Sequence, residues 1–240
     1  MDTLERPIEC LFSHHCDAES HDLGYRIAIS LVHFGLRVGV DNLCVGDSVR
    51  SWMISTEFQA LIFAGTPESW ASDFCMVEME AAQARSAPIF VLRVCGPIPA
   101  HQAGRLWLEL EDLREPAFSS LMERLGSAIR DRVEFVARVR QMVRTADPLE
   151  SAEAARDLAV VTRPVILSEN ADVLARHFGA VQNAQLQYWL ARAIGRAATP
   201  QALGILQELK KSSPGRFALT GVEEAIEAFE TRVDLKEDFQ

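Results

Sequence analysis

One stretch decides the fold: Thr66-Pro67-Glu68-Ser69-Trp70-Ala71-Ser72-Asp73-Phe74-Cys75-Met76-Val77-Glu78. It predicts a turn and then a helix that opens with a cap at Ser72 and carries Glu78 inside it. The hydrophobic run at 60–64 precedes it and predicts a buried strand. Glu78 is therefore expected just beyond the end of a buried strand, where open parallel sheets bind ligands. A carboxylate there, beside an aromatic ring and a thiol, is a candidate for chemistry on a small molecule; a solvated Glu on a surface helix is the alternative.

Composition predicts a cytoplasmic globular protein of one large domain or two. The chain has 240 residues, 48% of them hydrophobic and 24% charged, which is ordinary for a globular protein. A net charge of −10 without a basic block argues against nucleic-acid binding. No apolar run reaches the roughly 18 residues of a membrane helix, and no signal-peptide pattern is present at the N-terminus. Five cysteines without C-x-x-C spacing indicate reduced thiols and not a disulfide framework or a metal site.

Strands and single helices alternate through a first domain, residues 1–145. This order predicts an α/β fold with right-handed crossovers, namely a flavodoxin-like parallel five-stranded sheet with helices on both faces. The expected strands are 8–12, 36–40, 60–65, 88–94 and 106–110. The expected helices include one with apolar residues from Leu23 to Phe34, one from Asp47 or Ser48 to Phe58, one at 72–85 and a long one at 117–145.

Residues 146–240 are expected to form a second, all-helical domain. Four prolines punctuate Ala- and Leu-rich stretches there: Pro148, Pro164, Pro200 and Pro214. The helix pattern at 186–195, followed by a second at 199–206, is echoed at 217–226, about 31 residues after the first. Paired short helices at such a period are typical of α-solenoids, and the segment resembles HEAT repeats. An irregular helical bundle is the alternative.

Three blocks in the first domain, taken together, resemble a TIR (Toll/interleukin-1 receptor) domain. The first is Leu11-Phe12-Ser13-His14 at the end of the first strand, with Asp17 as the following acidic residue. The second is Gly46-Asp47-Ser48 in the loop after the second strand, and the third is the stretch 66–78. One position departs from the family pattern, because Phe74 stands where the family has Trp before Cys75. Phe keeps the stacking face of the ring but lacks the indole N–H donor.

The resemblance implies an enzyme that cleaves the nicotinamide–ribose bond of NAD+, with ADP-ribose released in linear or cyclic form. It implies Glu78 as the catalytic residue, with Glu80 as the nearby alternative, and NAD+ as substrate without a separate cofactor or metal. The positions that it implies for substrate binding are Ser13, His14, Asp47, Ser48, Trp70 and Phe74. Helix capping is the alternative role for Ser13, Asp47 and Ser48.

The expected function is that of a prokaryotic defence or signalling effector activated by self-association. Family members use the loop after the second strand in assembly, and here that loop is 41–48, with Leu43 and Val45 at an apolar tip. The helical domain would bind an activating partner. A non-catalytic TIR scaffold that signals by homotypic docking is the main alternative. An enzyme similar to nucleoside deoxyribosyltransferases is a third possibility.

Overall fold

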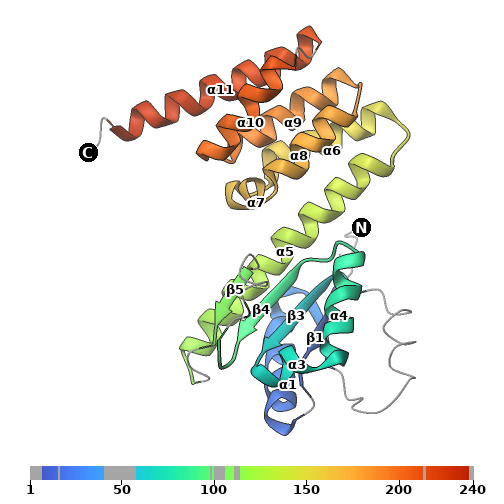
Figure 1. The fold of residues 1–240 in the computed structure, drawn as a ribbon, viewed down its shortest axis with the longest axis vertical. Coiled ribbons are helices and arrows are strands. Elements are labelled where there is room, and N and C mark those ends of the chain that lie inside the picture. The colour runs from blue at the N-terminus through green and yellow to red at the C-terminus, as the bar shows by residue number, and fades with distance from the viewer. Residues whose placement is uncertain are drawn as a thin grey trace. The chain divides into compact units, whose positions relative to one another are not determined.

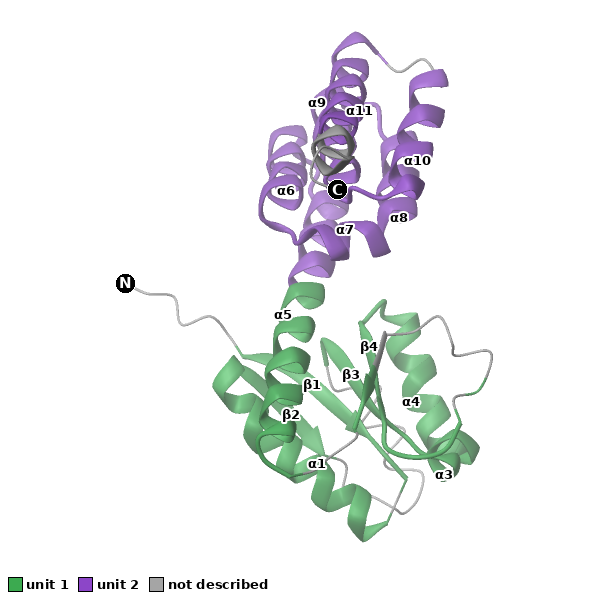
Figure 2. Cartoon of the chain, turned by 90° about the vertical axis from the view of Figure 1, so that its left-hand side faces the viewer, with its two compact units in different colours: residues 1–133 green, residues 134–240 purple. Residues whose placement is uncertain are grey.

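The computed structural model of this chain is an α/β structure followed by a helical segment (Figure 1). It describes residues 7–15, 17–40, 58–97, 99, 106–110, 114–212 and 215–237. The helix expected between Asp47 and Phe58, and the loop 41–48, lie outside the described residues except for Phe58. Contacts divide the chain into two compact units, Met1–Val133 and Glu134–Gln240 (Figure 2).

Unit 1 is built on a five-stranded, fully parallel sheet in the order β2-β1-β3-β4-β5. The strands are β1 (Ile8–Ser13), β2 (Leu36–Val40), β3 (Ala60–Gly65), β4 (Ile89–Arg93) and β5 (Leu106–Glu109). The predicted strands therefore form, each within about one residue of its expected ends. The order reverses direction between β1 and β3, so the crevice at the carboxyl ends of these two strands is where an open parallel sheet binds ligands.

Helices cover both faces of the sheet. On one face, α1 (Ala18–Leu31) and α5 (Ala117–Arg144) pack against Phe12, Ile62 and Phe90. On the other face, α4 (Asp73–Ala84) packs through Cys75, Met79 and Ala82 against Leu11, Leu61, Phe63 and Val91. All six residues of β3 are buried, as expected of a central parallel strand. Two short helices, η1 (Val32–Phe34) and α3 (Pro67–Ala71), also lie in the described part of this unit.

Unit 2 is helical throughout its described residues. It begins within α5 and continues with α6 (Pro148–Val161), α7 (Pro164–Glu169), α8 (Ala171–Ala180), α9 (Ala184–Arg196), α10 (Pro200–Lys211) and α11 (Arg216–Glu237). Pro148, Pro164 and Pro200 each stand at the first turn of a helix, where the missing N–H has no intrahelical partner to lose. These prolines start the helices because their fixed φ suits a first turn.

The second unit has its own hydrophobic core, centred on α9. Leu190, Ala191 and Ile194 of α9 are fully buried. They pack in one cluster with residues of α6, α8, α10 and α11. In the parts of the chain that the structure describes, no helix is both long and apolar enough to cross a membrane.

Candidate functional site at the carboxyl ends of β1 and β3

The stretch that follows β3 forms two short helices in place of the expected turn and single helix. Thr66 caps α3, because its side chain accepts a hydrogen bond from the Ser69 N–H, and Pro67 occupies the first turn. The chain leaves α3 at Ser72, which has extended dihedral angles (φ −82°, ψ 115°) and caps α4 by accepting from the Cys75 N–H. The cap at Ser72 was predicted; the separate helix α3 was not.

The break at Ser72 separates the two aromatic residues of the predicted site. Trp70 lies on α3, and its ring packs on Phe63 of β3 with 4.5 Å between centroids. Phe74 lies in the first turn of α4 and is half-buried. Because a break in the helix lies between them, Trp70 does not take the place of Phe74 on the same helix face.

Glu78 is fully buried on the face of α4 that packs against the sheet. It follows Cys75 by three residues, so the two side chains share one side of the helix, and Met79 and Ala82 complete that buried side. Glu80 is exposed. Of the two carboxylates that the sequence offered, Glu78 is therefore the one that faces the sheet. Burying a carboxylate in a protein interior costs free energy, and buried ionisable groups of this kind are concentrated at functional sites.

Cys75 connects α4 to the end of β1. Its thiol donates a hydrogen bond to the carbonyl oxygen of His14, with 3.2 Å between Sγ and O. Burial raises the pKa of the Cys75 thiol, and the nearby negative charge of Glu78 raises it further. The residue is therefore a neutral thiol at neutral pH, which is poorly suited to act as a nucleophile.

Ser13 and His14 leave the end of β1 in opposite directions. Leu11 packs on the α4 side of the sheet and Phe12 on the α1 side, so alternation along the strand directs Ser13 toward α4 and His14 toward α1. The ring of His14 accordingly lies beside the rings of Phe12 and His21, at centroid distances of 5.5 and 5.8 Å. The structure thus places Ser13 on the same side of the sheet as Glu78, and the imidazole of His14 on the other.

Ser13 Oγ and His14 Nε2 are both buried. Ser13 Oγ lies near the Cys75 thiol, and a hydrogen bond between these two side chains lowers the pKa of Cys75, against the larger rise that burial causes. His14 Nε2 has no hydrogen-bond partner among the described residues. The Nδ1 atom of His14 lies 2.6 Å from the carbonyl oxygen of His15, which can only accept, so Nδ1 carries a proton. In the neutral ring, Nε2 is then a lone-pair acceptor. Buried polar atoms of this kind are often completed by water or a ligand.

The sequence analysis gave Ser69 no role of its own, yet its side chain makes a hydrogen bond to the backbone that follows β1. Ser69 is fully buried, and its Oγ accepts a hydrogen bond from the backbone N–H of His15, 3.1 Å away. The Thr-x-x-Ser spacing of Thr66 and Ser69 could have indicated helix α3, because a Thr side chain often caps the backbone N–H three residues later. The predicted substrate residues Asp47 and Ser48 lie outside the described residues.

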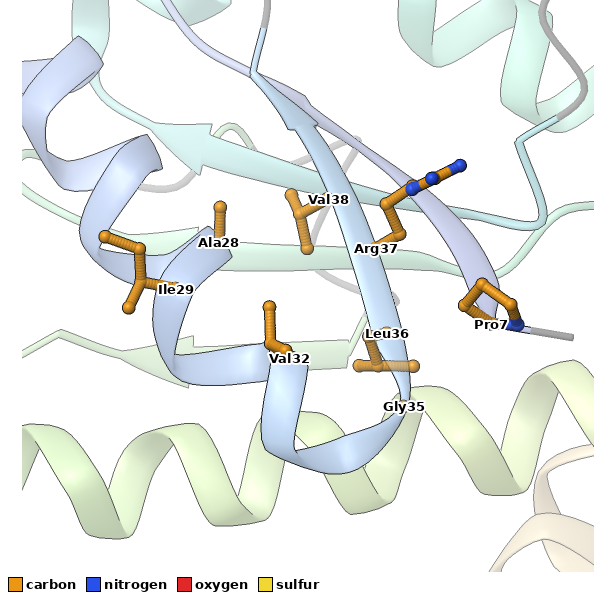
Figure 3. Close-up of a pocket in the computed structure, with 8 residues that line it drawn as sticks. All are labelled: Pro7, Ala28, Ile29, Val32, Gly35, Leu36, Arg37 and Val38. Atoms are coloured by element: carbon orange, nitrogen blue, oxygen red, sulfur yellow. The ribbon is translucent and has the colours of Figure 1, made fainter. Parts of the chain in front are cut away.

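An apolar pocket lies beside the amino-terminal ends of β1 and β2 (Figure 3). It is formed between α1, η1 and β2 by Ala28, Ile29, Val32, Leu36, Val38 and neighbouring residues. Pro7 and Leu36 stand at the amino ends of β1 and β2, whereas Ser13 ends β1. Its described lining is apolar apart from Arg37 and contains no carboxylate.

The chain was also compared with known proteins. No protein-family model, curated protein or solved structure matches it.

Proposed function

We propose that unit 1 is a TIR-like domain with a flavodoxin-like sheet and that it cleaves the bond between nicotinamide and ribose in NAD+. The observation that carries the proposal is the buried carboxylate of Glu78, on the sheet-facing side of α4. Cys75, one turn earlier, is bonded to the backbone that follows β1. Three sequence blocks in the TIR order support the same reading, and the strand order is the one found in flavodoxin-like folds.

The chemistry needs little more than one carboxylate in a site with little water. Nicotinamide leaves NAD+ as a neutral molecule, so no general acid is required. Positive charge develops on the ribose as the glycosidic bond breaks, and a fixed carboxylate stabilises it. Glu78 supplies this charge in the proposed reaction. Ser13 Oγ, buried on the same side of the sheet, is placed to bind a polar group of the substrate.

Access to Glu78 then requires movement. Its side chain has no solvent-exposed surface, so a substrate reaches it only when the residues that cover it separate. We infer that the isolated chain has low activity and that assembly opens and completes the pocket. In this proposal the helical unit 2, which resembles HEAT repeats in sequence, binds an activating partner, and the protein acts as a prokaryotic defence or signalling effector.

A non-catalytic scaffold is the second candidate, and two observations favour it. Phe74 stands where the TIR pattern has Trp, so the indole N–H donor is missing. The full burial of Glu78 also agrees with a structural carboxylate. A scaffold would associate through unit 1 without consuming NAD+.

The decisive experiment is nicotinamide release from NAD+ by purified protein at nanomolar and micromolar concentrations. Glu78→Gln removes the charge while preserving the shape of the side chain, and we expect at least about a 100-fold loss of turnover. Glu80→Gln is the matched control, since Glu80 lies two residues away on the same helix and is exposed. Turnover that survives Glu78→Gln would disprove the assignment. Self-association with no nicotinamide release at any concentration would establish the scaffold.

A further inference from the structure

One peptide group is held on both of its polar atoms by side chains from two different helices. The carbonyl oxygen of His14 accepts a hydrogen bond from the Cys75 thiol of α4, 3.2 Å away. The N–H of His15, on the other side of the same peptide bond, donates to Ser69 Oγ of α3, 3.1 Å away. This peptide comes directly after β1, so the two bonds attach α3 and α4 to the carboxyl end of that strand.

The two side chains are themselves fixed by helix caps. Ser69 donates its backbone N–H to Thr66 Oγ1, and the two hydroxyl oxygens lie 3.1 Å apart. The backbone N–H of Cys75 donates to Ser72 Oγ at 3.4 Å. Ser69 and Cys75 are both fully buried, so water does not compete for their bonds to the peptide. The capping hydrogen bonds therefore fix the positions of Ser69 and Cys75, and these two residues in turn bind the peptide.

The geometry links this peptide to the proposed reaction centre from two directions. Ser13, whose buried hydroxyl lies beside the Cys75 thiol, immediately precedes the peptide in sequence. Glu78 follows Cys75 by three residues on the buried side of α4. A shift of the peptide relative to α4 would therefore change the spacing between the Ser13 hydroxyl and the Glu78 carboxylate.

We propose that Ser69 and Cys75 are positioning residues, which clamp the His14–His15 peptide so that Ser13 and Glu78 keep the spacing that catalysis needs. This inference rests on the proposed function. In it, Cys75 acts as a hydrogen-bond donor and takes no covalent part. Its raised pKa, due first to burial and then to the charge of Glu78, agrees with that role because only the protonated thiol can donate. The competing explanation is that Cys75 merely fills space.

The clamp and simple packing predict opposite orders for two substitutions of Cys75. Cys75→Ser keeps a donor, whereas Cys75→Ala removes it. We expect Cys75→Ala to lower kcat for NAD+ about 10- to 100-fold with a smaller change in KM, and Cys75→Ser to restore kcat to within about threefold of the wild type. If Cys75 only fills space, Cys75→Ser is the worse variant, because a hydroxyl is costly in an apolar interior; that order would overturn the proposal. Cys10→Ala is the control, as Cys10 is a buried thiol on β1 that does not contact this peptide.

Amide hydrogen exchange tests the clamp without relying on activity. The N–H of His15 should be protected in the wild type and in Cys75→Ser, and it should exchange at least about tenfold faster in Ser69→Ala and Cys75→Ala. Equal exchange in all four proteins would overturn the clamp whether or not NAD+ is cleaved. The expected exchange pattern in a wild-type protein that releases no nicotinamide would support the clamp and reject the proposed function.

Discussion

The backbone of Gly221 in α11 lies so close to Tyr188 in α9 that a Cβ atom at position 221 would come within 2.9 Å of both the Cα and the carbonyl oxygen of Tyr188. The same two helices approach closely at Gly195, where a Cβ would lie 2.7 Å from the Cβ of Ala225. Because Gly195 and Gly221 have no side chain, α9 and α11 can pack backbone against backbone. Since backbone atoms cannot move aside as a flexible side chain can, this contact is sensitive to a single methyl group.

Gly221→Ala should therefore destabilise the helical unit by about 1–3 kcal/mol, as expected for overpacking. Gly204→Ala is the matched control, since Gly204 also lies inside a helix of this unit but has no atom within 4 Å of an added Cβ. That substitution should stabilise the protein by about 0.5–1 kcal/mol, because Ala is the better helix former. Thermal unfolding followed by circular dichroism measures both. A Gly221→Ala protein as stable as Gly204→Ala would show that the helices are not in backbone contact.

Cys10 should make the stability of the protein fall at alkaline pH. Burial, with a smaller effect from the charge of Glu9, raises the pKa of Cys10 from 9.0 to about 12. Between these two values the unfolded chain loses this proton and the folded chain keeps it. The free energy of unfolding should therefore decrease by about 1.4 kcal/mol per pH unit from pH 9 upward on account of this one thiol.

Urea unfolding between pH 8 and 10.5 tests this expectation. Cys10→Ala should be less stable than the wild type at pH 8, and the difference should shrink above pH 9. Cys95→Ala is the control, because it removes an exposed thiol in place of a buried one. A constant gap between Cys10→Ala and the wild type across this range would contradict the prediction.

Phe74 should contribute to NAD+ binding through its ring face alone. Phe74→Ala removes an aromatic surface that is half-exposed in the first turn of α4, and KM for NAD+ should rise about tenfold with a smaller change in kcat. Phe74→Trp should keep KM near the wild-type value. A higher kcat for Phe74→Trp would show that the indole N–H adds a hydrogen bond that this chain lacks. An unchanged KM in Phe74→Ala would place Phe74 outside the substrate site.

Activity per molecule should rise with protein concentration if assembly completes the site. Replacing Leu43 and Val45 by Asp should lower activity at micromolar concentration without unfolding the domain, because charged side chains oppose association through an apolar loop. Ile29→Asp is the control, since Ile29 is an exposed apolar residue on α1, in the lining of the apolar pocket. Total activity strictly proportional to protein concentration, which means a constant activity per molecule, and unaffected by the double substitution, would contradict assembly. Equal loss in Ile29→Asp would instead point to the α1 face as the interface.

Much of the fold could be predicted because it depends on local pattern. The apolar runs that became β1 and β3, and the helix pattern from 199 that became the start of α10, lie within one residue of their expected positions. The cap at Ser72 and the opposite orientations of Glu78 and Glu80 follow from the geometry of one helix. The separate helix α3 was missed because a Thr-Pro pair can begin either a turn or a helix. The hydrogen bonds that the Thr66 and Ser69 hydroxyl oxygens accept, from the backbone N–H groups of Ser69 and His15, decide between them.

The sequence by itself determined the periodicities: most of the strands and helices, and the fact that Glu78 and Glu80 point to different sides of α4. Burial in the folded chain decided that Glu78 is the one that faces the sheet. Only the tertiary structure decided what meets at the end of β1. It separated the side chains of Ser13 and His14, placing the imidazole beside His21 of α1. It also joined the His14–His15 peptide to Ser69 and Cys75, which lie 54 and 61 positions away. Periodicity reports on neighbours within one element, whereas contacts between distant segments depend on how whole elements pack, and no local pattern encodes that.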